Sequence, residues 1–210
     1  MGRALVRFAS SVMAVTGAML VLVAGVTLLW QEPLSALTAS RAQNRLERDL
    51  STLEAHRAPE RDLRAAARRY GTGLRPGKPF GRIEMPTLDR RYVLVQGTDA
   101  ESLRKGPGHY PRTALPGMGR TVAVAGHRTT YLAPFKTIDR LRRGDRIRIR
   151  MPYGRFVYRV SRTRIVRPTD VWVTRNIGRE QLVLTACHPL YSAAERIVVF
   201  ADLASQEAAS

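Results

Sequence analysis

The stretch Val183-Leu184-Thr185-Ala186-Cys187-His188-Pro189 is the most informative part of this chain, because an apolar run ends there on the only cysteine of 210 residues. Aliphatic and β-branched residues closed by a proline predict a strand over 181–185. Such a strand would carry the thiol to one edge of a sheet. A lone cysteine in that position is either an inert, buried small side chain or a nucleophile.

Two distant residues supply what a reactive thiol needs. His127 follows the apolar run 121–125, and Arg196 opens the apolar run 197–200. An imidazole can take a proton from a thiol and return it to a leaving amine. An arginine, always charged and carrying forked N–H donors, can stabilise the oxyanion that forms when an amide is attacked. We therefore expect Cys187 to be the nucleophile, His127 the general acid and base, and Arg196 the oxyanion or substrate stabiliser.

The C-terminal part of the chain is long enough for one compact core and is rich in short β-type stretches. These stretches cover 81–85, 92–96, 121–125, 146–151, 156–166, 181–185 and 196–200. Polar and apolar residues alternate over 146–150, which is typical of a half-solvated strand, whereas 121–125 and 197–200 are apolar throughout and suit central strands. Helices are expected only near 100–105 and 133–141. The pattern predicts a mostly β protein with a closed or nearly closed barrel.

From about Lys78 to Leu203 the chain resembles the sortases, whose signature is a strand reading Thr-Leu-x-Thr-Cys, with an arginine on the next strand and a histidine after an earlier one. The stretches 106–111, 125–135 and 141–145 resemble class E sortases of high-GC Gram-positive bacteria more narrowly. Val183 and Ala186 depart from the signature, which has threonine at both positions. The resemblance implies a closed β-barrel of about eight strands.

The resemblance also implies an activity. Cys187 would cleave a C-terminal sorting motif of the Leu-Ala-x-Thr-Gly or Leu-Pro-x-Thr-Gly type between Thr and Gly, and an amine of a peptidoglycan precursor or cross-bridge would resolve the thioacyl enzyme. Tyr110 lies in a Gly/Pro-rich loop that the family places near the substrate, so it either contacts the sorting peptide or packs. Two alternatives remain open: a class D-like or pilin-polymerising sortase, and a non-catalytic, membrane-tethered barrel that binds the envelope.

The N-terminal region predicts a membrane anchor. The stretch Ser11 to Trp30 carries no charge, and about 20 helical residues at roughly 1.5 Å each cross a hydrocarbon core of roughly 30 Å. Arg3 and Arg7 precede this stretch and Glu32 follows it, which places the N-terminus in the cytoplasm and the later residues outside. We expect a single-pass protein of the cell membrane with an extracellular catalytic domain. The alternative is a cleaved signal peptide.

The predicted organisation is therefore a cytoplasmic segment 1–10, an anchor 11–30, a stalk and linker 31–77, a catalytic domain 78–204 and a tail 205–210. Leu46, Leu50 and Leu53 share one helical face. They favour a helical stalk that lifts the domain off the bilayer, with a charged, partly disordered linker as the alternative. The Gly/Pro-rich segment 71–79 predicts a flexible joint.

Charge and composition narrow the possible partners. Thirty-five basic and 17 acidic residues give a formal charge of +18, which suits nucleic acid or an anionic envelope. Aromatic residues for base stacking are sparse, and the domain is expected outside the cytoplasm, so we expect no nucleic-acid partner. One cysteine excludes a disulfide framework and a multi-thiolate zinc site. The acidic residues form no calcium loop, so we expect no metal and no cofactor.

Overall fold

The computed structural model describes residues 2–29, 33–55 and 62–209. The expectations for Trp30 and Glu32, and for the linker over 56–61, lie outside these residues. The described strands are β1 (Pro79–Met85), β2 (Arg90–Gln96), β3 (Gly108–His109), β4 (Val122–Ala125), β5 (Arg146–Met151), β6 (Gly154–Val166), β7 (Gln181–His188) and β8 (Glu195–Ala208). They close into a barrel in the order β1-β2-β3-β4-β7-β8-β6-β5, which confirms the predicted fold class.

Four helices and three short 3₁₀ turns complete the described part of the chain. They are α1 (Gly2–Leu29), α2 (Pro33–Ala55), α3 (Leu63–Thr72), α4 (Ala100–Lys105), η1 (Pro86–Leu88), η2 (Ile138–Arg140) and η3 (Val171–Thr174). The helix expected near 133–141 is only the turn η2. A right-handed helix cannot begin at Ala133, because Tyr131, Leu132 and Ala133 have left-handed backbone angles, with φ of 50°, 66° and 41°.

Alternation along the strands separates the barrel interior from its outer face. On β7 and β8, Leu184 and Val199 belong to the interior core, whereas Val183 and Val198 belong to a second cluster on the other side of the sheet. Strand β5 alternates exposed and buried residues as predicted. Strands β4 and β8, which were expected to be central, are apolar on both faces. Their outer face is also buried, because Val173 of η3, in the segment after β6, packs against it.

Strand β8 is longer than its apolar run. It pairs with β6 from Val166↔Arg196 to Gly154↔Ala208, with irregular register at two places. Residues 205–208 therefore belong to the barrel rather than to the predicted tail. The sequence pattern did not predict this extension, because the second half of the strand is solvated and mostly polar.

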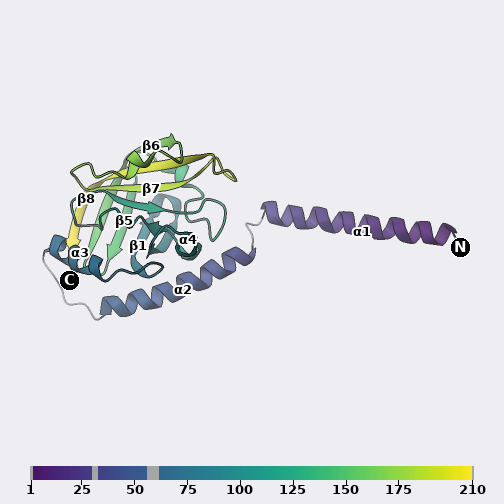
Figure 1. Cartoon of the computed structure of the whole chain (residues 1–210), viewed down its shortest axis with the longest axis horizontal. Helices are drawn as coiled ribbons and strands as arrows, with labels where there is room; N and C mark the ends of the chain where they lie inside the picture. The colour runs from purple at the N-terminus through teal and green to yellow at the C-terminus, as the bar shows by residue number, and fades with distance from the viewer. Residues whose placement is uncertain (1, 30–32, 56–61, 210) are drawn as a thin grey trace.

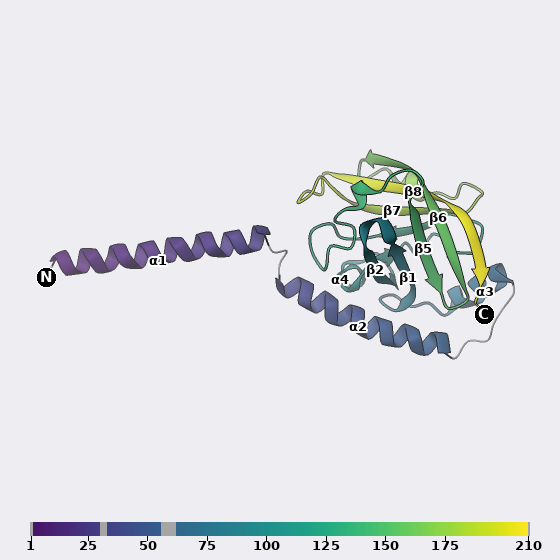
Figure 2. The same ribbon diagram turned by 180° about the vertical axis from the view of Figure 1, so that it is seen from behind.

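Helix α2 lies along the barrel, as Figures 1 and 2 both show. Leu46 and Leu50 are buried against Val93 and Val95 of β2, whereas Leu53 is about half exposed. The expectation of a helix is right, but the expectation of a stalk that lifts the domain is wrong for this segment. The leucine stripe packs on the domain itself because it covers apolar side chains on the outer face of β2.

Polar contacts fix α2 in place. The side-chain amide of Gln43 accepts a hydrogen bond from the Val93 N–H at 2.8 Å and donates to the Lys105 carbonyl at 2.7 Å. Arg82 on β1 is 4% exposed and forms ion pairs with Glu47 and Glu54 of the helix. A buried guanidinium needs such partners, so α2 is part of the folded domain.

The segment 71–79, expected to be a flexible joint, is packed in part, since Gly77 and Pro79 are buried and Leu74 packs against the core. Helix α3, which leads into it, is packed as well. Ala66 and Ala67 of α3 are fully buried in the barrel core, and Asp62 caps the helix by accepting from two backbone N–H groups. The N–H of Gly77 donates to the Gln96 carbonyl at 2.7 Å. Helix α3 therefore closes one end of the barrel.

Helix α1 projects away from the barrel (Figure 1). Its residues Arg7–Val26 form one stretch that is long and apolar enough to cross a membrane, by length and composition. A signal sequence near the N-terminus passes the same test. The described helix begins before the predicted anchor, at Gly2.

Candidate active site

Strands β4 and β7 run parallel and bring His127 and Cys187 to the same edge of the sheet. Their register pairs Ala125 with Thr185, and the Gly126 N–H donates to the Thr185 carbonyl at 3.0 Å. His127 and Cys187 each lie two residues beyond this pair. Because side chains alternate along a strand, Cys187 of β7 faces outward as Thr185 does, whereas His127 lies beyond the end of β4 in the loop that follows.

Strand β8 adds the arginine. Cys187 and Arg196 are direct antiparallel partners, so their side chains leave the same face of the sheet. That face is the outer one, since the next residues, Ala186 and Ile197, belong to the interior core. Cys187 and Arg196 thus share the outer face of β7 and β8, and His127 lies in the loop that follows the neighbouring strand β4.

The guanidinium of Arg196 is held by backbone carbonyls at the end of the β7–β8 loop and the start of β8. Its Nη1 donates to the carbonyls of Ala193 at 2.9 Å and Glu195 at 2.8 Å. Within residues 62–209 no hydrogen bond joins the thiol, the imidazole and this guanidinium. The structure therefore shows the thiol and the guanidinium on one face, with Arg196 positioned by backbone acceptors.

His127 lies in a partly buried, positively charged environment. Burial lowers the pKa of its imidazole from the ordinary value, and the charge of Arg104 on α4 lowers it further. The ring of Tyr131 lies against the imidazole, with 5.2 Å between centroids, and the Arg104 guanidinium lies 6.0 Å from the Tyr131 ring centre. A lowered pKa favours the neutral imidazole, the form that can accept the thiol proton.

A tight loop sets the position of His127. The Phe135 N–H donates to the His127 carbonyl at 3.0 Å, and the left-handed residues 131–133 turn the chain back. The ring of Phe135 occupies the space in which a side chain at position 126 would begin, only 2.5 Å from an ideal Cβ. Glycine is therefore required before His127.

Arg128 is a residue of the site to which the sequence assigned no role. It is 4% exposed, and its Nη1 donates to the Cys187 carbonyl at 3.4 Å and to Nδ1 of His188 at 3.2 Å. Its Nη2 donates to the Lys136 carbonyl at 3.2 Å and to the Asp139 carboxylate at 3.0 Å. The guanidinium thus ties the histidine loop to the end of β7. A charge directly after the predicted catalytic histidine was the available signal.

Tyr110 lies on the same outer face as the predicted catalytic residues. Its hydroxyl is 2.9 Å from Oγ1 of Thr185, two residues before the cysteine, and its ring packs against the outer cluster that contains Val183. Val183 is fully buried there, so this departure from the signature adds apolar surface to the face. Ala186, the second departure, faces the interior core.

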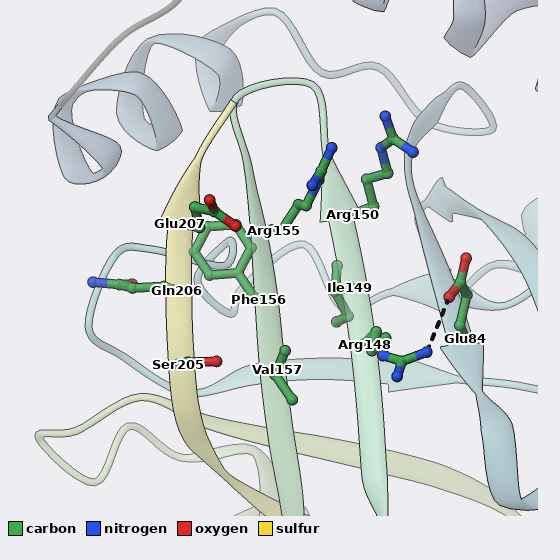
Figure 3. A pocket seen from close by; sticks show the side chains of 10 residues that line it. All are labelled: Glu84, Arg148, Ile149, Arg150, Arg155, Phe156, Val157, Ser205, Gln206 and Glu207. Atoms are coloured by element: carbon green, nitrogen blue, oxygen red, sulfur yellow. Dashed lines mark ion pairs between the residues drawn. The ribbon is translucent and has the colours of Figure 1, made fainter. Parts of the chain in front are cut away.

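A groove elsewhere on the barrel shares none of these residues (Figure 3). It measures about 530 Å³ and lies over β1, β5, β6 and β8. Arg148 extends toward Glu84 along one side, at 3.9 Å. Among the described residues no group of three or more His, Cys, Asp or Glu side chains is arranged to hold a metal ion.

The comparisons with known proteins agree on one family. A family model described as "Sortase domain" matches residues 83–204. Sortase D of Bacillus subtilis is 35% identical over 54% of this chain and 56% of its own length. Sortase SrtE1 of Streptomyces coelicolor is 24% identical over 91% of this chain and 55% of its own length. The chain thus spans about half the length of these curated relatives.

Solved structures give the same picture for the barrel. Sortase E of Streptomyces avermitilis is 34% identical, with a TM-score of 0.59, over 64% of this chain and 93% of that one. A Clostridium perfringens sortase D5 transpeptidase is 20% identical, with a TM-score of 0.69, over 79% and 99% of the two chains. At that identity the second likeness concerns the fold alone.

Proposed function

The chain belongs to the sortase family, and from this we propose that it is a membrane-anchored cysteine transpeptidase similar to class E sortases. One observation supports the proposal: Cys187 and Arg196 are direct partners on β7 and β8, and the parallel pair β4–β7 leads into the loop that carries His127. A thiol, a base and a fixed cation are what acyl transfer from an amide requires.

The first half-reaction forms a thioester. Sγ of Cys187 gives its proton to neutral His127 and attacks the Thr carbonyl of the sorting motif, and Arg196 stabilises the resulting oxyanion. When the oxyanion collapses, the C–N bond to Gly breaks, and the leaving amine takes the proton from His127. The tail departs, and the substrate protein stays on Cys187.

The second half-reaction reverses these roles. An incoming amine gives its proton to His127 and attacks the thioester carbonyl. The C–S bond then breaks, a new amide forms, and the proton returns to the thiolate of Cys187. When no amine is available, water can resolve the thioester in the same way, which yields hydrolysis.

The sorting peptide would lie on the outer face beside Cys187. The apolar cluster on that face, formed by Ala123, Val183, Val198 and Phe200, is buried under Val173 and Tyr110, so the peptide would lie at its edge, against the partly exposed Tyr110. A solved structure of sortase E1 from Streptomyces coelicolor, a protein 26% identical to this chain, holds a tripeptide in its active site. We extend that placement to this chain, with Tyr110 as a contact for the peptide.

Topology completes the proposal. Helix α1 would remain as the anchor, with the N-terminus in the cytoplasm and the barrel outside, because Arg3 and Arg7 precede the apolar stretch. The acceptor would be an amine of a peptidoglycan precursor or cross-bridge. The likeness to sortase D supports a second candidate, a class D-like enzyme.

The test uses the full-length protein in detergent micelles. Peptides that carry Ala or Pro at the second position of the motif are incubated with enzyme, and products are identified by mass. Cleavage between Thr and Gly with preference for Ala supports the class E-like interpretation, and preference for Pro supports the alternative. No cleavage of either peptide would contradict the proposed function and leave a binding barrel.

A further inference from the structure

The strand registers arrange the outer face around the nucleophile as three rows of side chains across β6, β8, β7 and β4. In that strand order the rows are Val166, Arg196 and Cys187; then Arg164, Val198, Thr185 and Ala125; then Arg162, Phe200, Val183 and Ala123. Residues opposite one another on neighbouring strands share a face. Two arginines of β6 therefore border the catalytic face on the side opposite to β4.

Arg164 is close to the reaction centre. Adjacent strands lie about 4.8 Å apart and alternate residues about 6.7 Å apart, so its Cα is roughly 12 Å from that of Cys187, two strands and one row away. An arginine side chain is long enough to cover most of the neighbouring strand. Arg164 is exposed, and no carboxylate of the described residues forms an ion pair with it.

Arg162 is held beside Arg164 in a definite place. Its guanidinium carbon lies 4.4 Å from the centre of the Phe200 ring. Stacking on a ring uses the face of the guanidinium and leaves its N–H edge available to an anion. The two cations thus lie opposite Val198 and Phe200, one and two rows from the row that contains Cys187.

Two carboxylates of the neighbouring segments, Asp202 and Asp170, are already engaged elsewhere. Asp202 of β8 pairs with Arg179 at 3.2 Å and accepts from Gln181 at 2.9 Å. Asp170, after β6, pairs with Arg167 at 3.5 Å. The field on the β6 side of Cys187 is therefore positive, and it would repel a simple ammonium ion that approaches the thioester from that side.

We propose that Arg164 and Arg162 form an anion subsite for the incoming acceptor, so that the enzyme selects amines that carry a carboxylate or phosphate a few bonds from the nucleophilic nitrogen. This deepens the proposed function and rests on it. The anion of the acceptor binds the two guanidinium groups, and its neutral amine then attacks the thioester carbonyl. The C–S bond breaks as the C–N bond forms, and His127 takes the amine proton and returns it to the thiolate. An acceptor amine without a nearby carboxylate or phosphate, such as a lysine side chain, gains no binding energy from this subsite.

The experiment measures how the thioester partitions between amines and water. Full-length protein in detergent is mixed with a sorting peptide and with matched acceptors: diglycine against diglycine amide, and O-phosphoethanolamine against ethanolamine. The aminolysis product and the hydrolysis product are quantified by mass. Arg164→Gln and Arg164→Glu are compared with Arg148→Gln, which removes the same charge from an exposed site in the groove of Figure 3.

We expect the wild-type enzyme to prefer the anionic member of at least one pair by about three- to tenfold, as for one or two solvent-exposed ion pairs. Arg164→Gln should remove most of this preference, Arg164→Glu should reverse it, and Arg148→Gln should keep it. The preference should shrink as salt rises to about 1 M. Equal use of both members of each pair, or a preference that survives Arg164→Glu, would overturn the subsite. Absence of peptide cleavage by the wild type would instead overturn the proposed function.

Discussion

Cys187 and Arg196 are direct cross-strand partners on β7 and β8, so the backbone ladder of the barrel sets the spacing between the nucleophile and the cation. Neither residue lies in the interior core, since both are partly exposed on the outer face. Substitutions at these positions therefore change the chemistry of the site with little effect on the barrel.

Substitution of Arg196 separates charge from geometry. Lys keeps the charge but loses the planar fork, so Arg196→Lys should retain only a small part of the turnover and Arg196→Ala less. A lost oxyanion donor lowers the rate by about 10²–10³ in comparable sites. Steady-state kinetics with a sorting peptide measures this effect in kcat. A raised KM with unchanged kcat would instead show that Arg196 binds the ground-state substrate.

The pH profile of cleavage should report the His127 environment. Because burial and Arg104 lower the His127 pKa, the imidazole stays neutral to lower pH, and the acidic limb of kcat/KM should lie below the ordinary histidine value of about 6.5. Arg104→Gln removes one cause, so the pKa rises and the acidic limb moves to higher pH. Added salt should move the wild-type limb in the same direction. A limb that does not respond to either change would exclude His127 as the titrating base.

Arg128 should act by positioning the site. Arg128→Met removes the donors to Cys187 O, His188 and Asp139, and we expect a loss of about 1–3 kcal/mol in unfolding free energy and a fall in kcat. Thermal unfolding and kinetics measure the two effects. Asp139→Asn is the matched control, because it leaves the guanidinium and its carbonyl acceptors in place. If kcat is the same in the Met variant as in the wild type, the link between the two segments has no role in catalysis.

Helix α2 should be held to the barrel by Arg82. Arg82→Ala leaves Glu47 and Glu54 without their cation, and both are partly exposed, so we expect a loss of about 1–3 kcal/mol. Proteolysis within α2 should accelerate in the same variant. Arg91→Ala is the control, since its pair with Glu84 is exposed and long, at 3.7 Å, and contributes little. Unchanged protease resistance in Arg82→Ala would show that the apolar contacts of Leu46 and Leu50 suffice.

The local pattern of polar and apolar residues was enough to predict most strands of the barrel. The alternation of β5 and the apolar runs of β4, β7 and β8 predict those strands, because each pattern reflects burial on one face or both. Strand β3 has only two residues, too few for any periodicity. The solvated half of β8 carries no apolar signal, so its pairing depends on β6 and not on its own sequence.

The candidate site was only partly predictable. Residue types and order in the sortase-like motifs indicated Cys187, His127 and Arg196, since their chemistry is specific. The contacts of Arg128 depend on segments that are distant in the chain. The same is true of the packing of Leu46 and Leu50 on β2. A helical stripe shows that a face will be buried but not against which surface.

The thioester on Cys187 is the most direct test of the central claim. The full-length protein is incubated with a sorting peptide without an added amine, quenched in acid, and its intact mass is measured. We expect a mass increase equal to the peptide up to its Thr, located on Cys187 by fragmentation and removed by hydroxylamine. Cys187→Ala should show neither the adduct nor cleavage while keeping the wild-type unfolding temperature. Cleavage of the peptide by a folded Cys187→Ala variant would contradict the cysteine mechanism.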